Sequence, residues 1–357
     1  MKAMVLAAGK GTRLAPLTSE LPKPMLPVAG KPMIGHIFEL LERHGASEVH
    51  VNAYHLAEVI LERYGWETRI NGMKVKVTRE EELLGTAGGV RQLSEHFDET
   101  FVVIMGDALT DVDLRELVAF HRAQGALATL ALMPVADTRQ FGVVALDPDG
   151  NIRAFQEKPE PGEAMSNLAN TGIYVLEPEA LEYIPEETFF DFAKDVFPQL
   201  LAAGERFVGY RGSFYWSDVG TLQAYREAQR DVLSGRVWTR VPGERWDESL
   251  WVDREARIHP TAILGEQTVI GRGATVEPGA VLTGCVAVGQ SCRVEPDSTV
   301  RRSVLLTGSS VGEGAHLEDC IIGPGYEVPP GEWLRGEVLV TGARSGKHGP
   351  LMLSKPF

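Results

Sequence analysis

Residues suited to binding phosphate gather within the first 35 residues of the chain. The turn GKGT at positions 9–12 follows a short apolar run, which predicts a buried strand over residues 3–8. Two glycines let the backbone approach a ligand closely, so several N–H groups can converge on anionic oxygens. Arg13 and Lys23 add permanent positive charge. This combination favours a phosphate-binding loop.

Two familiar phosphate-binding motifs do not account for this loop. The chain contains no Walker A string, and Leu14 stands where the dinucleotide-binding fingerprint needs its third glycine. The run from residue 6 to residue 34 instead resembles the signature of the sugar-nucleotide pyrophosphorylases, which join a nucleoside triphosphate to a sugar 1-phosphate. The resemblance implies that Arg13 steadies the leaving pyrophosphate and that Lys23 contacts phosphate. The nucleotide-binding residues that it implies in this region are Leu6, Ala8, Gly9, Gly11, Thr12, Arg13 and Lys23.

Two aspartates are candidate metal ligands. Asp107 follows the apolar run 101–105, which predicts a buried strand ending beside the phosphate loop, and Asp218 in WSDVGT comes just before an expected helix. Magnesium is normally held by one or two carboxylates together with substrate phosphates. By residue type alone, Asp218 could cap the helix and Asp107 could form a turn. The family resemblance, in which both motifs recur, implies that the two aspartates share Mg²⁺.

Three further segments resemble sugar-binding motifs of the family. In FQEKP, the resemblance implies that Glu157 accepts hydrogen bonds from sugar hydroxyls and that Lys158 meets the sugar phosphate. In NTGIY, Asn170 takes the sugar-facing position, although Thr171 replaces the alanine of the family. In FGVV, the backbone of Gly142 is implied to approach the sugar. Taken alone, Glu157 and Lys158 could equally form a solvated ion pair.

The segment LGTAGG at residues 84–89 is expected to select the nucleobase. By itself it could be a helix that starts on a glycine turn. Family members that use thymidine carry a glutamine here, whereas this string resembles the mannose 1-phosphate guanylyltransferases. The resemblance therefore implies base binding by Gly85, Thr86 and Gly88, and it favours GTP and mannose 1-phosphate as substrates.

The composition is that of an ordinary globular protein. The chain has 357 residues, enough for two domains, of which 44 % are hydrophobic and 24 % charged. A net charge of -14 argues against general binding to nucleic acid or anionic membranes. No apolar run approaches the ~20 residues of a transmembrane helix, and no secretory pattern opens the chain, so we expect a cytoplasmic protein. Three cysteines without metal-site spacing are expected to be reduced.

Two kinds of repetition divide the chain. Strand-like and helix-like segments alternate over residues 1–234, which predicts a catalytic domain with a Rossmann-like doubly wound mixed α/β sheet. The expected strands are 3–8, 48–53, 74–78, 101–105, 127–133, 142–146, 152–157, 172–176 and 206–210. The expected helices are 33–44, 55–63, 87–96, 111–123, 191–203 and 219–233.

A six-residue period follows a connector expected over residues 235–255. Small or β-branched residues lie four positions after each aliphatic residue, which is typical of the faces of a parallel β-helix. The pattern resembles the left-handed hexapeptide-repeat domains and predicts a left-handed β-helix over 256–335, with 336–357 as a cap or tail. We also expect a homo-oligomer. The aliphatic positions are Ile258, Leu264, Ile270, Val276, Leu282, Val288, Val294, Val300 and Leu306.

These parts together predict magnesium-dependent nucleotidyl transfer. A phosphate oxygen of the sugar 1-phosphate attacks the α-phosphorus and pyrophosphate leaves, while the protein positions both anions and offsets their charge. Because the sugar phosphate is already ionised near neutrality, no general base is required. The expected catalytic residues are Arg13, Lys23 and Asp107, with Lys158 adding positive charge.

Three alternatives remain open. The first is a uridylyl- or thymidylyltransferase that acts on glucose 1-phosphate or a related sugar. The second is a catalytically silent regulatory or scaffold homologue, against which the presence of every charged motif residue argues. The third is acyl transfer by the hexapeptide domain, against which its small number of coils and the isolated His259 and His316 argue.

Overall fold

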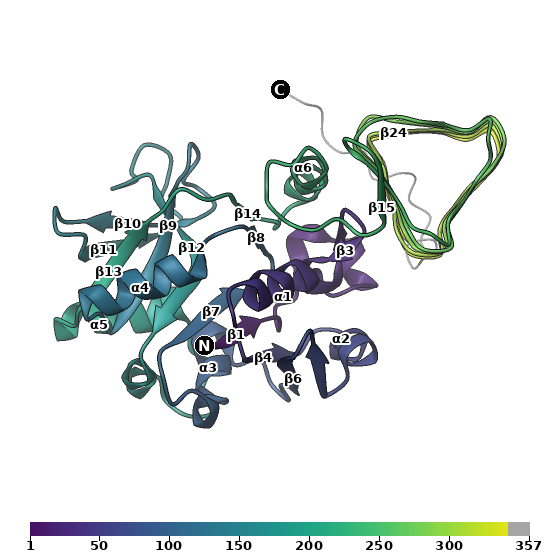
Figure 1. Cartoon of the computed structure of the whole chain (residues 1–357). Coiled ribbons are helices and arrows are strands. Elements are labelled where there is room, and N and C mark those ends of the chain that lie inside the picture. Colours follow the sequence, from purple (N-terminus) through teal and green to yellow (C-terminus); the bar gives the residue numbers. More distant parts are fainter. Residues whose placement is uncertain (342–357) are drawn as a thin grey trace. The chain divides into compact units, whose positions relative to one another are not determined.

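The computed structural model describes residues 1–341 of the chain, which form two units (Figure 1). Unit 1 comprises Met1–Lys10 and Ile37–Asp218, and unit 2 comprises Gly11–His36 together with the chain from Val219 onwards. The segment that carries Arg13 and Lys23 therefore belongs with the C-terminal part of the chain. Within residues 1–341, no helix is long and apolar enough to cross a membrane.

A mixed sheet forms the core of unit 1. β1 (Lys2–Leu6) lies at its centre and pairs in parallel with β4 (Glu48–Ala53) and β7 (Phe101–Met105). These three strands are almost fully buried, as expected for near-continuous apolar runs. β9 pairs with β12 and β13. The main path runs β11 (Ile152–Glu157), β10 (Gly142–Leu146), β12 (Leu168–Leu176), β7 (Phe101–Met105), β1 (Lys2–Leu6), β4 (Glu48–Ala53), β6 (Met73–Arg79) and β5 (Glu67–Ile70), with β9 (Ala128–Pro134) and β13 (Phe207–Arg211) off this path.

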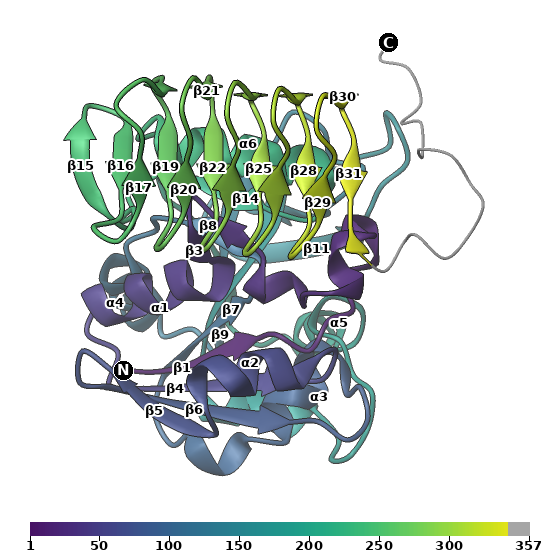
Figure 2. The same cartoon turned by 90° about the vertical axis from the view of Figure 1, so that its right-hand side faces the viewer.

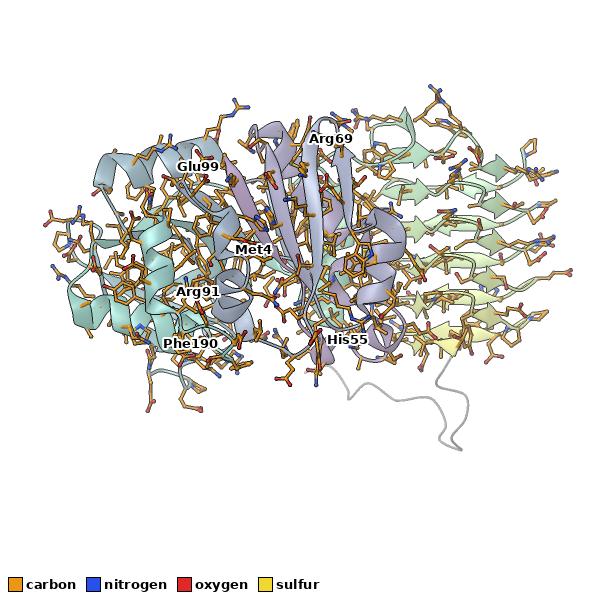
Figure 3. All side chains as sticks on the ribbon, turned by 90° about the horizontal axis from the view of Figure 1, so that it is seen from below. Met4, His55, Arg69, Arg91, Glu99 and Phe190 are labelled. Carbon is orange, nitrogen blue, oxygen red and sulfur yellow. The ribbon has the colours of Figure 1, made fainter. Side chains whose placement is uncertain are left out.

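Helices and a small second sheet complete unit 1. Its α-helices are α1 (Met33–Arg43, whose first turn belongs to unit 2), α2 (Ala57–Tyr64), α3 (Gly85–Arg91), α4 (Leu114–Gln124) and α5 (Phe197–Ala203), and the π-helix η6 (Phe192–Val196) precedes α5. Side chains of α3, η6 and α5 share one buried cluster with Met4, which Figure 3 labels on β1. β8 (Ala108–Thr110) and β14 (Trp216–Asp218) form a separate antiparallel pair. The predicted mixed α/β fold is confirmed.

Three sheets, parallel except for the antiparallel pair β15–β16, build the β-helix of unit 2, which is triangular end-on in Figure 1 and a stack of coils in Figure 2. Inward aliphatic residues form one continuous buried cluster, mostly at six-residue intervals, so the predicted hexapeptide β-helix is confirmed. The interval shortens to five residues after Val300, so Leu305, the register partner of Val288, takes the place in this cluster that was predicted for Leu306. The first sheet holds β15 (Glu244–Asp247), β16 (Leu250–Val252), β19 (Thr268–Ile270), β22 (Val286–Val288), β25 (Val304–Leu305), β28 (Ile321–Ile322) and β31 (Val338–Leu339). The second holds β17 (Arg257–Ile258), β20 (Thr275–Val276), β23 (Arg293–Val294), β26 (Ser310–Val311) and β29 (Glu327–Val328); the third holds β18 (Ile263–Leu264), β21 (Val281–Thr283), β24 (Thr299–Arg301), β27 (His316–Glu318) and β30 (Trp333–Arg335).

The β-helix extends beyond the bounds expected from the hexapeptide period. β16 was expected within the connector, but it pairs in parallel with β19 as the first coil. β31 falls where a cap or tail was expected, and it pairs with β28 as part of the last coil. The strand pairing of the β-helix therefore continues at both ends into residues where the six-residue sequence period is no longer visible. The rest of the expected tail, residues 342–357, lies outside the described residues.

Candidate active site

The phosphate loop begins where β1 ends. The Ala7 N–H donates to Asn52 Oδ1 at 2.9 Å, which ties the start of the loop to β4. Gly11 has φ +62°, and an added Cβ would lie 3.0 Å from Lys23 Cβ, so this position requires glycine. At Gly9, by contrast, an added Cβ would meet no described atom within 4 Å. The loop is therefore tightly packed at its second glycine and open at its first.

The two basic residues of the loop differ in burial. Lys23, on the 3₁₀ turn η3 (Lys23–Met25), is 9 % exposed, whereas Arg13, on η1 (Thr12–Leu14), is exposed. Both residues belong to unit 2. The packing of Gly11 against the stem of Lys23 links the glycine turn to the cation. A buried stem packed against the glycine turn holds the lysine in place beside the loop.

Helix α6 (Leu222–Leu233) holds the segment that follows Lys23. Tyr225 Oη and Gln229 Nε2 both donate to the carbonyl oxygen of Pro27, at 2.6 and 2.9 Å. Gln229 Oε1 accepts from the Ala29 N–H at 2.7 Å. Because Tyr225 and Gln229 are almost fully buried, these bonds fix the hairpin of β2 (Pro27–Val28) and β3 (Lys31–Pro32) firmly to α6.

The register of β8 and β14 brings the two candidate metal ligands to neighbouring strands. Asp218 is the register partner of Ala108, the residue directly after Asp107. Paired strands lie about 4.8 Å apart. The indole N–H of Trp216 donates to the carbonyl oxygen of Thr171 at 2.9 Å, which anchors β14 to β12. Both aspartates therefore sit at the same end of one ladder in unit 1.

This pair of carboxylates fits the chemistry of a magnesium site. Both side chains are partly exposed, and the residue before Asp107, Gly106, donates its N–H to Leu6 at the end of β1. In sites that bind phosphate, Mg²⁺ is usually held by one or two carboxylates, and its remaining coordination positions are taken by water and phosphate oxygens. Among residues 1–341 no cluster of three or more metal-binding side chains occurs. The two aspartates could hold the metal only together with a ligand such as phosphate or with water.

The candidate sugar residues Gly142 and Glu157 face each other across β10 and β11. They are register partners, and a Cβ on Gly142 would lie 2.4 Å from Phe155 Cζ and 2.8 Å from Glu157 Oε2. Glycine here leaves space for the glutamate carboxylate. Lys158 follows in the left-handed region at φ +45°, with its Nζ 3.4 Å from Glu157 Oε1. Both ends of this ion pair are open to a ligand, since Lys158 is 58 % exposed and Glu157 33 %.

Asn170 lies at an irregular point of β12. Its Nδ2 donates to Tyr174 Oη at 3.1 Å, and its Oδ1 accepts from the Gly172 N–H at 3.1 Å. Burial raises the pKa of Tyr174 far above its usual range, and the charges of Asp191, Glu157 and Asp107 raise it further, against the hydrogen bond from Asn170. The Tyr174 hydroxyl therefore stays neutral. Its pKa depends on the charges of both Glu157, a candidate sugar residue, and Asp107, a candidate metal ligand. Tyr174 is part of the sequence motif NTGIY, but the sequence alone predicts no role for it.

The base segment is folded against residues 188–192. The N–H groups of Ala87 and Gly88 both donate to the carbonyl oxygen of Phe190, at 2.9 and 3.1 Å (Phe190 is labelled in Figure 3). Gly85 has φ +77°, and an added Cβ would lie 2.5 Å from that same oxygen. At Gly88 an added Cβ would lie 2.6 Å from the carbonyl oxygen of Thr188. Both glycines are thus required by packing within the chain.

The hydroxyl of Thr86 is also engaged within the chain. It donates to Asp191 Oδ2 at 2.8 Å and accepts from the Phe192 N–H at 2.9 Å. Asp191 in turn caps η6 by accepting from the N–H groups of Ala193 and Lys194. Sequence reasoning missed Asp191, although an aspartate before the run FAKDV is a usual helix-start signal. Base binding by Gly85, Thr86 and Gly88 stays a prediction.

Comparison with known proteins decides the family. Residues 2–235 match the family described as nucleotidyl transferase, and residues 251–336 match the GlmU-like C-terminal hexapeptide family. The chain belongs to the nucleotidyl transferase family. The predicted family and its hexapeptide domain are both confirmed.

The relatives of this nucleotidyltransferase agree on the reaction type. A UTP–glucose-1-phosphate uridylyltransferase of Synechocystis is 42 % identical over 258 residues, which are 68 % of this chain and 66 % of the relative. A mannose-1-phosphate guanyltransferase of Candida albicans is 34 % identical over 349 residues, 96 % of this chain and 91 % of the relative. A solved structure of a putative glucose-1-phosphate thymidylyltransferase from Bacillus anthracis is 26 % identical, with a TM-score of 0.59 over 67 % of this chain and 97 % of that one. The predicted enzyme class, a sugar-1-phosphate nucleotidyltransferase, is confirmed, while the names differ in base and sugar.

Proposed function

We propose that this nucleotidyltransferase makes GDP-mannose from GTP and mannose 1-phosphate with the help of Mg²⁺. The observation that carries the nucleotidyl-transfer part is the register of β8 and β14, which sets Asp107 and Asp218 at the same end of one ladder. A pair of partly exposed carboxylates on rigid strands is the donor set that a phosphate-bound magnesium ion needs.

In the proposed reaction a phosphate oxygen of the sugar 1-phosphate forms a bond to the α-phosphorus of the nucleotide. The bond from that phosphorus to the bridging oxygen breaks, and pyrophosphate leaves with the electron pair. Arg13 and Lys23 hold the departing anion, while Lys158 and Glu157 orient the sugar phosphate and the sugar hydroxyls. When bound at Asp107 and Asp218, Mg²⁺ supplies charge compensation to the phosphates.

The choice of base and sugar rests on the segment at residues 84–89. Its sequence resembles the guanylyltransferases, and the Candida albicans relative, named for the same substrates, matches over nearly the whole chain. The rival pair is UTP and glucose 1-phosphate, which is favoured by the 42 % identity to the Synechocystis uridylyltransferase. Both readings use the same carboxylates and cations.

A matrix assay tests the proposal. Pyrophosphate release is measured with Mg²⁺ across GTP, UTP, ATP, dTTP and CTP against mannose, glucose and glucosamine 1-phosphates. A maximum at GTP with mannose 1-phosphate supports the full proposal. A maximum at UTP with glucose 1-phosphate keeps the reaction and replaces the specificity. No release in any well, from folded protein, would favour a catalytically silent homologue.

We also propose that the chain forms a homo-oligomer through the β-helix. The third sheet presents one outward ladder in register, Ile263, Val281, Thr299, His316 and Trp333. Its two ends are 58 and 77 % exposed, and the rings of His316 and Trp333 stack at 4.2 Å. An antiparallel second copy would set Ile263 against Trp333 and Thr299 on the two-fold axis. Light scattering should show a smaller species for Trp333→Glu; an unchanged mass would contradict this interface.

A further inference from the structure

A buried amide and a buried carboxylate lie directly beneath the two nucleotide-binding segments of unit 1. Asn52, near the end of β4, and Glu80, just after β6, are each only 1 % exposed. Asn52 Nδ2 donates to Glu80 Oε1 at 2.7 Å. A charged residue this deep in a protein needs a reason, because burying a carboxylate costs stability unless hydrogen bonds compensate.

Each side chain uses its second polar atom to hold one segment. Asn52 Oδ1 accepts from the N–H of Ala7, the first residue of the phosphate loop, at 2.9 Å. Glu80 Oε2 accepts from the N–H of Leu84, the first residue of the base segment, at 3.3 Å. The pair thus makes a continuous chain of hydrogen bonds from one segment to the other. In Figure 3, Met4 marks β1, His55 marks the connection that follows β4, and Arg91 marks the end of α3.

Gly89 gives the pair a third contact with the base segment. A Cβ added at Gly89 would lie 2.5 Å from Asn52 Nδ2 and 2.7 Å from Glu80 Oε1. Helix α3 therefore rests directly on the pair, with no side chain between them. A shift of either side chain would move the helix that opens with the proposed base-binding residues.

The arrangement of donors and acceptors is specific to an amide at position 52 and an ionised carboxylate at position 80. Glu80 faces two donors, the Asn52 amide and the Leu84 N–H, so both of its oxygens must accept. Asn52 faces one donor, the Ala7 N–H, and one acceptor. Burial raises the pKa of Glu80, and the bonds from Asn52 and Leu84 oppose that rise. A glutamine at position 80 would set its amide hydrogens against a donor.

We propose that Asn52 and Glu80 are positioning residues that set the phosphate loop and the base segment at the spacing the nucleotide requires. The proposal rests on the proposed function, because it takes Ala7–Gly9 and Gly85–Gly88 as parts of one nucleotide site. It assigns the pair no contact with the reacting atoms. Disturbing the pair should therefore weaken nucleotide binding while leaving the sugar phosphate site intact.

A reciprocal exchange of the two groups tests the proposal. Glu80→Gln leaves two donors face to face, and Asn52→Asp leaves two acceptors face to face, so each should raise the KM for the nucleotide about 10-fold. In the double variant the new carboxylate accepts from Ala7 and from the new amide, whose oxygen accepts from Leu84. All three bonds are then restored, with only the bond between positions 52 and 80 reversed in direction. The nucleotide KM should return to within about threefold of the wild type.

The measurements are steady-state KM values and calorimetric binding of GTP and UTP with Mg²⁺. The KM for mannose or glucose 1-phosphate should stay within about twofold in all variants, a split that a merely structural role would not produce. Single variants that raise both KM values equally, or a double variant no better than the singles, would overturn the proposal. Wild-type protein that binds and converts neither nucleotide would instead refute the proposed function.

Two further variants keep the test decisive. In Gly89→Ala the added methyl group would displace the side chains of Asn52 and Glu80 without changing their polar groups, so the nucleotide KM should rise. This variant tests the proposal even if a single exchange variant fails to fold. Glu177→Gln is the matched control, because Glu177 Oε1 also accepts two side-chain hydrogen bonds. They come from Thr100, just before β7, and from His121 of α4, both outside the base segment. An unchanged nucleotide KM in Gly89→Ala, or a KM raised equally by Glu177→Gln, would contradict the proposal.

Discussion

The two candidate regions of unit 1 are built in different ways. Asp107 and Asp218 are placed by strand register, which depends on backbone hydrogen bonds between β8 and β14. The base segment 84–89 is placed by contacts with residues far along the chain, above all the Phe190 carbonyl and the carboxylate of Asp191. The difference implies that the first region tolerates changes around it, whereas the second responds to changes in its support.

The largest effect should follow loss of a carboxylate charge in the first region. Asp107→Asn and Asp218→Asn keep the size of the side chain and the register, and each should lower kcat on the order of 10³-fold while the protein stays folded. Asp113→Asn is the control, because Asp113 caps α4 and faces His44 rather than the candidate metal site, and asparagine caps equally well. Turnover close to wild type in either the Asp107 or the Asp218 variant would contradict the assignment of these carboxylates as metal ligands.

A large effect on nucleotide affinity should follow from Gly85→Ala in the second region. The new Cβ would meet the Phe190 carbonyl oxygen at 2.5 Å with φ at +77°, so the segment must shift. We expect the nucleotide KM to rise about 10-fold, with kcat changed less. Gly72→Ala is the matched control, since Gly72 has φ +91° but nothing within 4 Å; it should cost only about 1 kcal/mol of stability. Equal KM values in the two variants would argue that the packing of residue 85 is irrelevant to binding.

A smaller effect should follow from Thr86→Val, which keeps the shape but removes both hydrogen bonds to residues 191 and 192. We expect the nucleotide KM to rise about fivefold, in line with one or two lost hydrogen bonds. Thr86→Ser retains the hydroxyl and should stay near the wild type. The comparison would be weakened if serine and valine gave the same kinetics.

The smallest effect on turnover should come from a buried group outside both regions. Burial, together with the neighbouring His96, lowers the pKa of His50 from 6.5 to about 4. The unfolded chain therefore binds more protons between these values, so the free energy of unfolding should fall by about 3 kcal/mol as the pH drops from 6.5 to 4. His50→Gln should reduce this slope, measured by denaturant unfolding, without changing kcat or KM at neutral pH. A slope equal to that of the wild type would contradict the pKa.

Much of the fold follows from local sequence patterns. The strands at 48–53 and 101–105 have the predicted bounds, because each is a short run dominated by apolar and β-branched residues. The edge strand β5 was missed, since the sequence ETRI alternates only weakly and is stabilised by pairing with β6. A helix was predicted over 87–96, but α3 covers 85–91 and a 3₁₀ turn follows at 94–96, because the contacts with Phe190 start the helix early.

The candidate site was predictable where a motif carries the chemistry. The aspartates, Glu157 and Asn170 stand out by residue type and by family resemblance. Asn52 and Glu80 do not, because a polar residue near a strand end carries no sequence signal for the partner that it meets 28 residues away. The same holds for Asp191, whose bond to Thr86 spans 105 residues. Long-range hydrogen bonds of this kind arise from topology, and no local pattern encodes them.

The central claim is that Asp107 and Asp218 support magnesium-dependent nucleotidyl transfer. The most direct test is pyrophosphate release from the full chain, with its best nucleotide and sugar 1-phosphate, while Mg²⁺ is removed with EDTA and then restored. We expect release to stop without the metal and to return, saturably, as Mg²⁺ is added back. Release that continues at the same rate in excess EDTA would contradict the account.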